Sequence, residues 1–429
     1  MTLDLNARLT IDKLGQRGEG IAHGPQGTLY IPHALPGETI IAELDRDRAK
    51  LVRVENPSPD RIAPVCPHYT LCGGCAVQGW AALPYLAWKQ ALVADALVHA
   101  GITAPVSPVI DAHGEGRRRV TFHARTFHDA RGFLHVETGF MQARAHKIIE
   151  IDACPILAPG LAAALAGARA VAKVLALLEK PLDIVISTTN TGLDVDIKGC
   201  GALDFHLTKK LMKLAEVHDF ARISNHGAIL LERRPPQLVM GRANLILPPG
   251  GFLQASVLGE ETIAGLVLAA TRKAKRVADL FAGVGTFALR LATHAAVHAV
   301  ESDARALAAC QRAAHDTPGL KALTGEARDL MVRPLTSAEL DRFDALVFDP
   351  PRAGAQAQAT QIARSCVPRV VAVSCNVQTF ARDAKILMEG GYTLDSVTPV
   401  DQFRYSPHVE MVGVFSRPAA KTKKRGLLS

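Results

Sequence analysis

The chain has 429 residues, of which 48% are hydrophobic and 21% charged, so it is long enough for two or three domains with their own cores. This composition excludes extended disorder, and the formal net charge of +8 at pH 7 favours a polyanionic partner, because neutralised phosphates release counterions. Every long apolar stretch contains a charge or a breaker, and the N-terminus lacks an export pattern, which predicts a cytoplasmic protein that does not enter a membrane.

The first predicted unit is a small barrel. Residues 1–56 are rich in glycine and contain short alternating runs at 28–32 and 39–44, separated by turns with glycine and proline. Short strands with this punctuation are typical of an OB-like β-barrel. We interpret the proline-rich run at 56–60 as a linker into a central domain, residues 57–250.

The central domain is expected to combine helices and strands in an α+β arrangement. Helix-like runs occur at 84–100 and, rich in alanine, at 161–178. An alternating stretch at 117–128 predicts a strand that opens with Arg117, Arg118 and Arg119. These arginines are candidates for holding a polyanion, and the alternative is that they cover an ordinary solvated sheet face.

Eight cysteines in an apparently cytosolic chain are expected to be thiols, metal ligands or nucleophiles and not disulfides. Three of them form a C-x5-C-x2-C group and a fourth follows later beside a proline. Four thiolates bind either an iron–sulfur cluster or a tetrahedral zinc ion, and spacing alone leaves both open. The group is Cys66, Cys72, Cys75 and Cys154, whereas Cys200, Cys310 and Cys366 belong to no motif and are expected to be packed thiols.

The C-terminal part, residues 251–418, is predicted to be a Rossmann-like α/β domain. Apolar strand-like runs alternate here with helical runs, as in a doubly wound sheet with helices on both faces. A basic tail at 419–429 follows the domain. The predicted strands are 276–281, 296–301, 345–349, 369–374 and 411–415.

A glycine-rich turn follows the first of these strands in the run DLFAGVGTF, residues 279–287. Gly283 and Gly285 let the backbone approach a ligand, and Glu301 closes the next strand where it could bind a ribose hydroxyl. The same spacing fits the dinucleotide fingerprint, so an NAD-dependent oxidoreductase is one alternative. The run VFDPPR favours an adenosylmethionine-dependent methyltransferase instead, since it ends a third strand with Asp349 and two stiff prolines.

Two further residues are predicted to reach the same edge of the sheet. Cys375 directly follows a strand, and Glu410 begins the last one. If the last strand is antiparallel, both residues lie with Asp349 where the parallel strands end, and ligands bind outside that edge. A structural cysteine and an ordinary strand-entry glutamate are the alternatives.

Together these motifs closely resemble the RNA (uracil-5-)-methyltransferase family, in particular its members that carry an iron–sulfur cluster and act on 23S ribosomal RNA. The resemblance covers essentially the whole chain. It includes the N-terminal part, which is similar to a TRAM domain, together with the cysteine group, DLFAGVGTF, DPPR at 349–352, SCN at 374–376 and HVEM at 408–411.

The resemblance implies a covalent mechanism with S-adenosylmethionine as methyl donor. Carbon 5 of uracil is a poor nucleophile, so the thiolate of Cys375 would add at carbon 6, and Glu410 would later remove the carbon 5 proton. It also implies that the four grouped cysteines hold a 4Fe-4S cluster. The residues implied to contact S-adenosylmethionine are Gln254, Phe281, Gly283, Gly285, Thr286, Glu301 and Asp349.

The implied partner is structured RNA, bound by a monomer through the N-terminal barrel and Arg117 to Arg119. Related enzymes methylate either ribosomal or transfer RNA, and 23S ribosomal RNA is the expected substrate, with transfer RNA as the alternative. An RNA-binding or iron–sulfur protein without catalysis is a further alternative, which the intact Cys375 and Glu410 disfavour. The chain departs from the family pattern at Ser256 and Thr286, where asparagine is usual.

Overall fold

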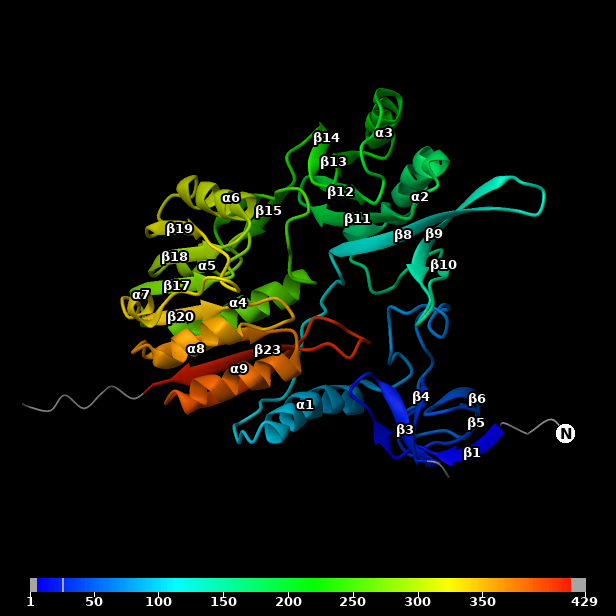
Figure 1. Ribbon diagram of the computed structural model, residues 1–429, viewed down its shortest axis with the longest axis horizontal. Coiled ribbons are helices and arrows are strands. Elements are labelled where there is room, and N and C mark those ends of the chain that lie inside the picture. Colours follow the sequence, from blue (N-terminus) through cyan, green and yellow to red (C-terminus); the bar gives the residue numbers. More distant parts are fainter. Residues whose placement is uncertain (1–5, 25–26, 418–429) are drawn as a thin grey trace, which may run out of the picture.

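The computed structural model describes residues 6–24 and 27–417, which form three main sheets (Figure 1). The predicted basic tail at 419–429 lies outside the described residues. The N-terminal sheet (blue), the central sheet (cyan to green) and the C-terminal sheet (yellow to red) occupy three separate parts of the molecule. The helices are α1 (Ala82–His99), α2 (Ala164–Leu175), α3 (Phe205–Val217), α4 (Val257–Thr271), α5 (Ala288–Leu291), α6 (Ala304–His315), α7 (Ser337–Leu340), α8 (Gln356–Arg364) and α9 (Val377–Glu389).

The N-terminal sheet has six short strands and curls around its own small core, in agreement with the predicted barrel-like unit. The strand order is β1-β5-β6-β4-β3-β2, and all pairs are antiparallel except β4 with β6. Alternate residues such as Leu29 and Ile31 point into the core. The strands are β1 (Asn6–Thr10), β2 (Lys13–Leu14), β3 (Glu19–Gly24), β4 (Gly27–Pro32), β5 (Thr39–Asp45) and β6 (Arg48–Asn56).

The central sheet has seven strands in the order β10-β9-β8-β11-β12-β13-β14. Helices α2 and α3 cover one of its faces. The apolar residues Val120 and Phe122 alternate along β8 and face α2, and α3 packs on β13 and β14. The strands are β8 (Arg119–His128), β9 (Leu134–Met141), β10 (Ile148–Glu150), β11 (Leu182–Thr189), β12 (Gly192–Lys198), β13 (Phe220–Asn225) and β14 (Ala228–Glu232).

The segment Pro159–Leu178 is long and apolar enough to cross a membrane by length and composition alone, with a mean hydropathy of 1.8. In the fold it is divided into α2 and two 3-10 turns, η1 (Pro159–Leu161) and η2 (Ala176–Leu178). Ala168 and Val171 of α2 are fully buried against the central sheet. The segment is therefore explained as the core helix of a folded domain.

The C-terminal sheet is the predicted doubly wound sheet, with strand order β19-β18-β17-β20-β21-β23-β22-β7. All neighbours are parallel except β23, which is antiparallel to both β21 and β22, so the expected antiparallel last strand is confirmed. Its strands are β7 (Ile110–Asp111), β17 (Arg276–Leu280), β18 (Ala296–Glu301), β19 (Leu323–Ala327), β20 (Ala345–Phe348), β21 (Arg369–Ser374), β22 (Thr393–Asp401) and β23 (Glu410–Ser416).

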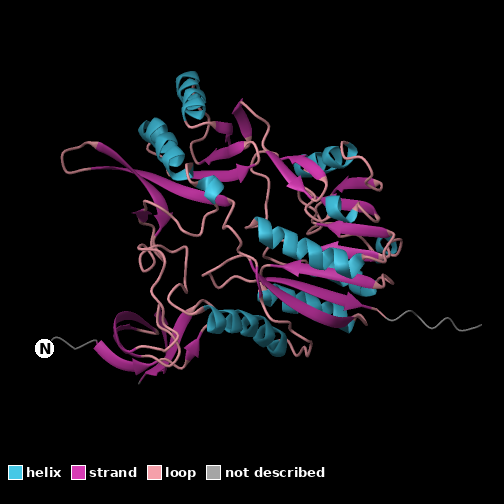
Figure 2. Ribbon diagram, turned by 180° about the vertical axis from the view of Figure 1, so that it is seen from behind, coloured by secondary structure: helices cyan, strands magenta, loops and turns pink. Residues whose placement is uncertain are grey.

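Helices cover both faces of this sheet (Figure 2). Helices α4, α5 and α6 pack on one face with the ribbon of β15 (Gln237–Met240) and β16 (Ala243–Ile246), and α1, α7, α8 and α9 pack on the other. Both α1 and β7 come from the segment assigned by sequence to the central domain. Periodicity predicts that α1 has a buried face, but it does not say which sheet buries that face.

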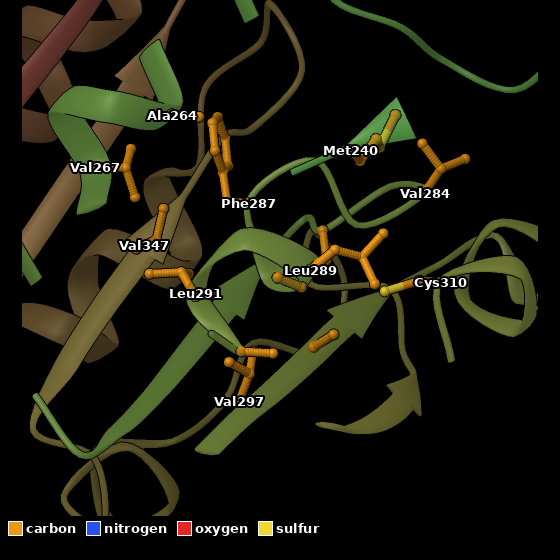
Figure 3. Close-up of a cluster of buried hydrophobic side chains, with 14 of the residues drawn as sticks. Met240, Ala264, Val267, Val284, Phe287, Leu289, Leu291, Val297, Cys310 and Val347 are labelled. Atoms are coloured by element: carbon orange, nitrogen blue, oxygen red, sulfur yellow. The ribbon is translucent and has the colours of Figure 1, made fainter. Parts of the chain in front are cut away.

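The buried core beneath the glycine-rich turn (Figure 3) explains why residue 285 of that turn is a glycine. Gly285 has φ +93°, and a Cβ atom there would lie 2.3 Å from the sulfur of buried Cys310. Only glycine therefore lets the turn approach α6 this closely.

Candidate active site

A cavity of about 900 Å³ opens where three parts of the chain meet: the loop at 64–80 that carries Cys66, Cys72 and Cys75 (the cysteine loop), strand β8 and the carboxyl edge of the C-terminal sheet. Its lining comes from segments that are far apart in sequence. The predicted site residues that line it are Cys66, Cys72, Cys75, Cys154, Gln254, Phe281, Gly283, Glu301, Asp349, Cys375 and Glu410.

The glycine-rich turn forms one wall of the cavity. Phe281 follows β17 with φ +62°, which turns the chain sharply, and Gly283 has φ +56°. No atom lies within 4 Å of the position of a Cβ at Gly283, so this backbone faces open space. The Gly283 amide donates to Oε2 of Glu301 at 2.9 Å. Gly285 and Thr286, although predicted to bind cofactor, do not line the cavity; Gly285 faces Cys310 and Thr286 is buried.

Two carboxyl groups line the cavity and are linked by glutamines: Asp349 is half-buried, and Glu410 is buried. Gln254 donates to Asp349 at 3.1 Å, and Gln402 donates to both Gln254 at 2.7 Å and Glu410 at 3.0 Å. Burial raises the pKa of Asp349 to about 7. Burial, followed by the nearby charge of Asp349, raises the pKa of Glu410 to about 8. Sequence reasoning missed Gln402, because no motif surrounds it.

Cys375 lies between β21 and α9, at the same edge as these carboxyl groups. Asn376 caps α9 by accepting from the amides of Gln378 and Thr379. Burial, and then the negative charges of Glu410 and Asp349, raise the pKa of the Cys375 thiol to about 11. The guanidinium of Arg352, from the DPPR run, opposes this shift.

Asp279, the first residue of DLFAGVGTF, is completely buried beneath the site. Neither of its carboxyl oxygens has a hydrogen-bond partner within the described part of the chain. Burial, and then the charge of Asp349, raise its pKa well above the ordinary value. Burial therefore favours the neutral form of this carboxyl group.

The loop at 402–409 leads into Glu410 and is fixed from two sides. The ammonium group of Lys89, on α1, contacts Asp401 at 2.8 Å and donates to the carbonyls of Phe403 and His408. On the other side, the amides of Ala76 and Val77 in the cysteine loop donate to the carbonyl of Tyr405 at 2.7 and 3.0 Å. The cysteine loop and α1 thus both hold the segment that precedes Glu410.

The four grouped cysteines line the cavity. Burial raises the pKa values of Cys72 and Cys75, and that of Cys154 to about 11, and at least one other thiol of the group adds to each shift. Among residues 6–24 and 27–417, no three His, Cys, Asp or Glu residues lie close enough together to hold a metal ion.

The three remaining cysteines differ in exposure. Cys200 and Cys310 are buried, which confirms that they are packed thiols. Cys366 is exposed, so that prediction was wrong for this residue. It lies between α8 and β21, where the turn leaves the side chain outside the core.

The three arginines at the start of β8, Arg117 to Arg119, have different environments. Arg118 is buried, forms an ion pair with Glu260 and donates to the carbonyl of Gln254 at 3.0 Å, so it holds protein groups together and is not free to contact RNA. Arg117 and Arg119 line the cavity. Arg119 donates to the carbonyl of Gly251 at 2.7 Å. Consecutive residues of a strand point to opposite sides, which explains the difference.

A doubly wound sheet with a glycine-rich turn and this arrangement of carboxyl groups at its carboxyl edge defines an S-adenosylmethionine-dependent methyltransferase. The family model described as tRNA (Uracil-5-)-methyltransferase matches residues 251–418. An RNA methyltransferase of Brucella suis is 45% identical over 97% of this chain and 99% of its own length. The 23S rRNA (uracil(1939)-C(5))-methyltransferase RlmD of Halomonas elongata is 30% identical over 97% of this chain and 91% of its own.

The chain therefore belongs to the RNA (uracil-5-)-methyltransferase family, and it is an enzyme that uses S-adenosylmethionine. The fold agrees with that of the Pyrococcus abyssi tRNA (uracil-54, C5)-methyltransferase in complex with S-adenosyl-L-homocysteine. That structure has a TM-score of 0.72 and 22% identity, and the match covers 95% of this chain and 99% of the other. Membership of this family decides against the NAD-dependent oxidoreductase that the spacing of the glycine-rich turn left open.

Proposed function

We propose that this enzyme methylates carbon 5 of a uridine in 23S ribosomal RNA through a covalent adduct with Cys375, with Glu410 as the base. The observation that carries the proposal is that Cys375 and Glu410 line the same cavity and interact electrostatically. Cys375 directly follows β21 and Glu410 begins β23, and the two residues lie at the same edge because β23 is antiparallel to β21.

The glycine-rich wall of the cavity fits the methyl donor. Gly283 presents open backbone, and Glu301 and Asp349 offer carboxyl oxygens to hydroxyl and amino groups. Gln254, fixed by Arg118 and Gln402, and the ring of Phe281 would complete the site. When bound, S-adenosylmethionine supplies the methyl group on a positively charged sulfonium.

Cys375 would act as nucleophile at carbon 6 of the flipped uracil. Its sulfur forms a bond to carbon 6, the electrons of the carbon 5–carbon 6 double bond move into the enolate, and carbon 5 then accepts the methyl group. The reaction needs the thiolate, and the charge of Arg352 stabilises that form.

Glu410 would complete the cycle as a general base. Its carboxylate takes the proton from the methylated carbon 5, the double bond re-forms, and the bond between carbon 6 and the sulfur of Cys375 breaks. The net products are 5-methyluridine, the demethylated donor and one proton. Gln402, which donates to Glu410, would keep the carboxylate oriented toward the substrate.

We propose that Cys66, Cys72, Cys75 and Cys154 hold a 4Fe-4S cluster, as the resemblance to the family implies. All four thiols line the cavity, and cysteine thiolates are the usual ligands of such a cluster. The amide of Gly74 donates to the sulfur of Cys72 at 3.4 Å, and hydrogen bonds of this kind tune iron–sulfur clusters. The proposed role is structural, since methyl transfer needs no electron.

The preference for ribosomal RNA is supported by the Halomonas elongata relative, which matches over nearly the whole chain. We also propose that the curled N-terminal sheet acts as a TRAM-like RNA-binding unit. Transfer RNA is the alternative substrate, favoured by the description of the family model.

The test uses tritiated S-adenosylmethionine with unmethylated 23S ribosomal RNA and, separately, transfer RNA. Label in 5-methyluridine from ribosomal RNA with the wild-type enzyme, and none with the Cys375→Ala variant, is the expected result. Label from transfer RNA alone would reassign the substrate. Equal label from the Cys375→Ala variant would overturn the covalent mechanism.

A further inference from the structure

The outward face of strand β8 carries a row of polar and aromatic side chains that starts inside the cavity. Because side chains alternate along a strand, this row faces away from the core residues Val120, Phe122 and Ala124. Successive members are about 6.7 Å apart, and the whole row spans about 27 Å. Its members are Arg119 and Thr121, which line the cavity, followed by His123, Arg125 and Phe127.

The outer end of the row lies on a hairpin that projects from the body of the molecule (Figures 1 and 2). Phe127 is 43% exposed and stacks on His135 of β9, with ring centroids 5.3 Å apart. Phe133, at the tip, is 65% exposed. The hairpin thus presents two exposed aromatic rings on one projecting element.

The hairpin tip is held in one shape by Asp129. Its Oδ1 accepts from the amides of Arg131 and Phe133, both at 2.9 Å, and its Oδ2 lies 2.9 Å from Nε2 of His135. The stacked pair of Phe127 and His135 is therefore preorganised, which reduces the entropy lost when a ligand binds.

Arg125 is the fourth of the five members of the row. Its side chain forms no hydrogen bond or ion pair within the described residues, and its buried Nε is without an acceptor. Glu137 is its cross-strand neighbour in the register, but no ion pair joins them. His123, by contrast, is already paired with Asp183 at 2.7 Å. The guanidinium of Arg125 is thus available to an external acceptor such as a phosphate.

We propose that this row is a track for single-stranded RNA next to the target uridine, with Arg125 on a phosphate and Phe127 with His135 stacking on a base. The inference rests on the proposed function, because it needs a uridine inside the cavity. Grooves for single strands combine positive charge with aromatic rings, and they cover about 4–16 nucleotides in known modules. The row offers both features and leads directly out of the cavity that contains Cys375.

The opposite face of the same sheet provides matched controls. Helix α3 covers that face and carries Phe205, which is 83% exposed, and Lys213, which is also exposed. Phe205→Ala removes an exposed ring and Lys213→Ala removes an exposed charge, and neither substitution alters a residue of the row.

The experiment measures the affinity of the full-length protein for a fluorescein-labelled oligouridine of about 12 nucleotides by anisotropy, over a range of salt concentrations. The Phe127→Ala variant is expected to weaken binding about tenfold, since one base loses its stacking partner. The Arg125→Gln variant is expected to reduce the slope of log affinity against log salt by about 0.7, the contribution of one phosphate contact. The Arg125→Lys variant should restore that slope.

Phe205→Ala and Lys213→Ala should leave both affinity and slope at the wild-type values. Unchanged affinity and slope in the Phe127→Ala and Arg125→Gln variants would overturn the proposed track. Equal losses in the control variants would also overturn it, because the loss would then be nonspecific. Methylation by the wild-type enzyme is scored separately, so a failure of the proposed function is seen as absent 5-methyluridine, whatever the oligouridine affinities are.

Discussion

The ammonium group of Lys89 lies 2.8 Å from the carboxylate of Asp401, and both side chains are almost fully buried, at 0% and 1% exposure. Tyr85 donates to the other oxygen of Asp401 at 2.7 Å and accepts from the amide of Tyr405. The three donors of the ammonium group are thus all used, two of them on carbonyls of the loop that leads into Glu410. Lys89 is a positioning residue for that loop.

Replacing Lys89 should reveal this role. In the Lys89→Met variant, Asp401 remains buried without its partner, and the free energy of unfolding is expected to fall by about 3–5 kcal/mol. The loop before Glu410 also loses its anchor, so a larger fraction of RNA should remain covalently bound to the enzyme, because proton removal slows. Urea unfolding and denaturing gels of the reaction mixture measure the two effects.

The control is Lys173→Met, the same change at an exposed lysine of α2, which should alter neither quantity. The double variant Lys89→Met with Asp401→Asn should regain part of the stability, since no unpaired charge is left. If the double variant also regains the wild-type fraction of covalent RNA, Lys89 does not position the loop.

The Glu410→Gln variant should separate the two halves of the reaction. Glutamine keeps the shape of the side chain but cannot take a proton, so turnover is expected to fall by a factor of about 10²–10⁴. Methylated RNA should accumulate as an adduct with Cys375, visible as a protein band that carries label from the methyl group. Glu216→Gln, at an exposed glutamate of α3, should behave as wild type. Loss of both product and adduct, as expected for Cys375→Ala, would contradict a base role for Glu410.

The pH dependence of kcat follows from the raised pKa values of Glu410 and Cys375. Both groups act in their deprotonated forms, and burial raises the pKa of Glu410 from 4.5 to about 8 and that of Cys375 to about 11, so kcat should rise with pH and should not level off at pH 8. The charge of Arg352 lowers the pKa values of both Glu410 and Cys375, so Arg352→Gln should move the rise to higher pH. Initial rates of methylation are measured at several pH values for the wild-type enzyme and for the Arg352→Gln variant. A flat profile near neutrality would contradict this assignment.

The cysteine group is expected to bind iron and to support the active site indirectly. Protein purified without oxygen should contain about four iron atoms per chain and no stoichiometric zinc. Cys75→Ser should lose the iron and lower kcat, because the neighbouring amides of Ala76 and Val77 hold Tyr405 in the loop before Glu410. The metal content and the affinity for S-adenosylmethionine are measured on the same preparations. The affinity of the Cys75→Ser variant for S-adenosylmethionine should change little. The control is Cys366→Ser, which changes an exposed thiol outside the group. Zinc in place of iron in the purified protein would overturn the assignment of an iron–sulfur cluster.

Local sequence patterns predicted the elements and much of the cavity. The expected helix at 84–100 corresponds to α1 within two residues, and the expected strand at 117–128 contains β8. Strand-end positions were sufficient to bring Asp349, Cys375 and Glu410 together, because the topology of a doubly wound sheet is regular. The expected helix at 161–178 proved to be interrupted, since 3-10 turns at helix ends leave little trace in periodicity.

Residues that act through tertiary contacts could not be predicted in this way. Lys89 and Asp401 are separated by 312 positions, and Gln402 gains its role only from contacts with Gln254 and Glu410. One signal was available: Lys89 lies at helical spacing from Tyr85 and Leu92, on the apolar stripe of α1. A lysine on such a stripe must find a buried acceptor, but the sequence does not say which one.

The buried carboxyl group of Asp279 should reduce stability as the pH rises. Its pKa is higher in the folded protein than in the unfolded chain, so the folded state binds the proton more tightly. The protonated carboxyl group contributes its full stabilisation below the pKa that Asp279 has in the unfolded chain. This contribution is lost as the pH rises toward the higher pKa that Asp279 has in the folded protein.

The Asp279→Asn variant stays neutral at every pH and should therefore be more stable than wild type near pH 8, by about 1.4 kcal/mol per unit of pKa shift. The difference should shrink toward zero near pH 4, as measured by urea unfolding, and Asp316→Asn at an exposed position should show no such trend. If Asp279→Asn is less stable than wild type at pH 8, the carboxylate is held in its charged form and the assignment of a neutral Asp279 is wrong.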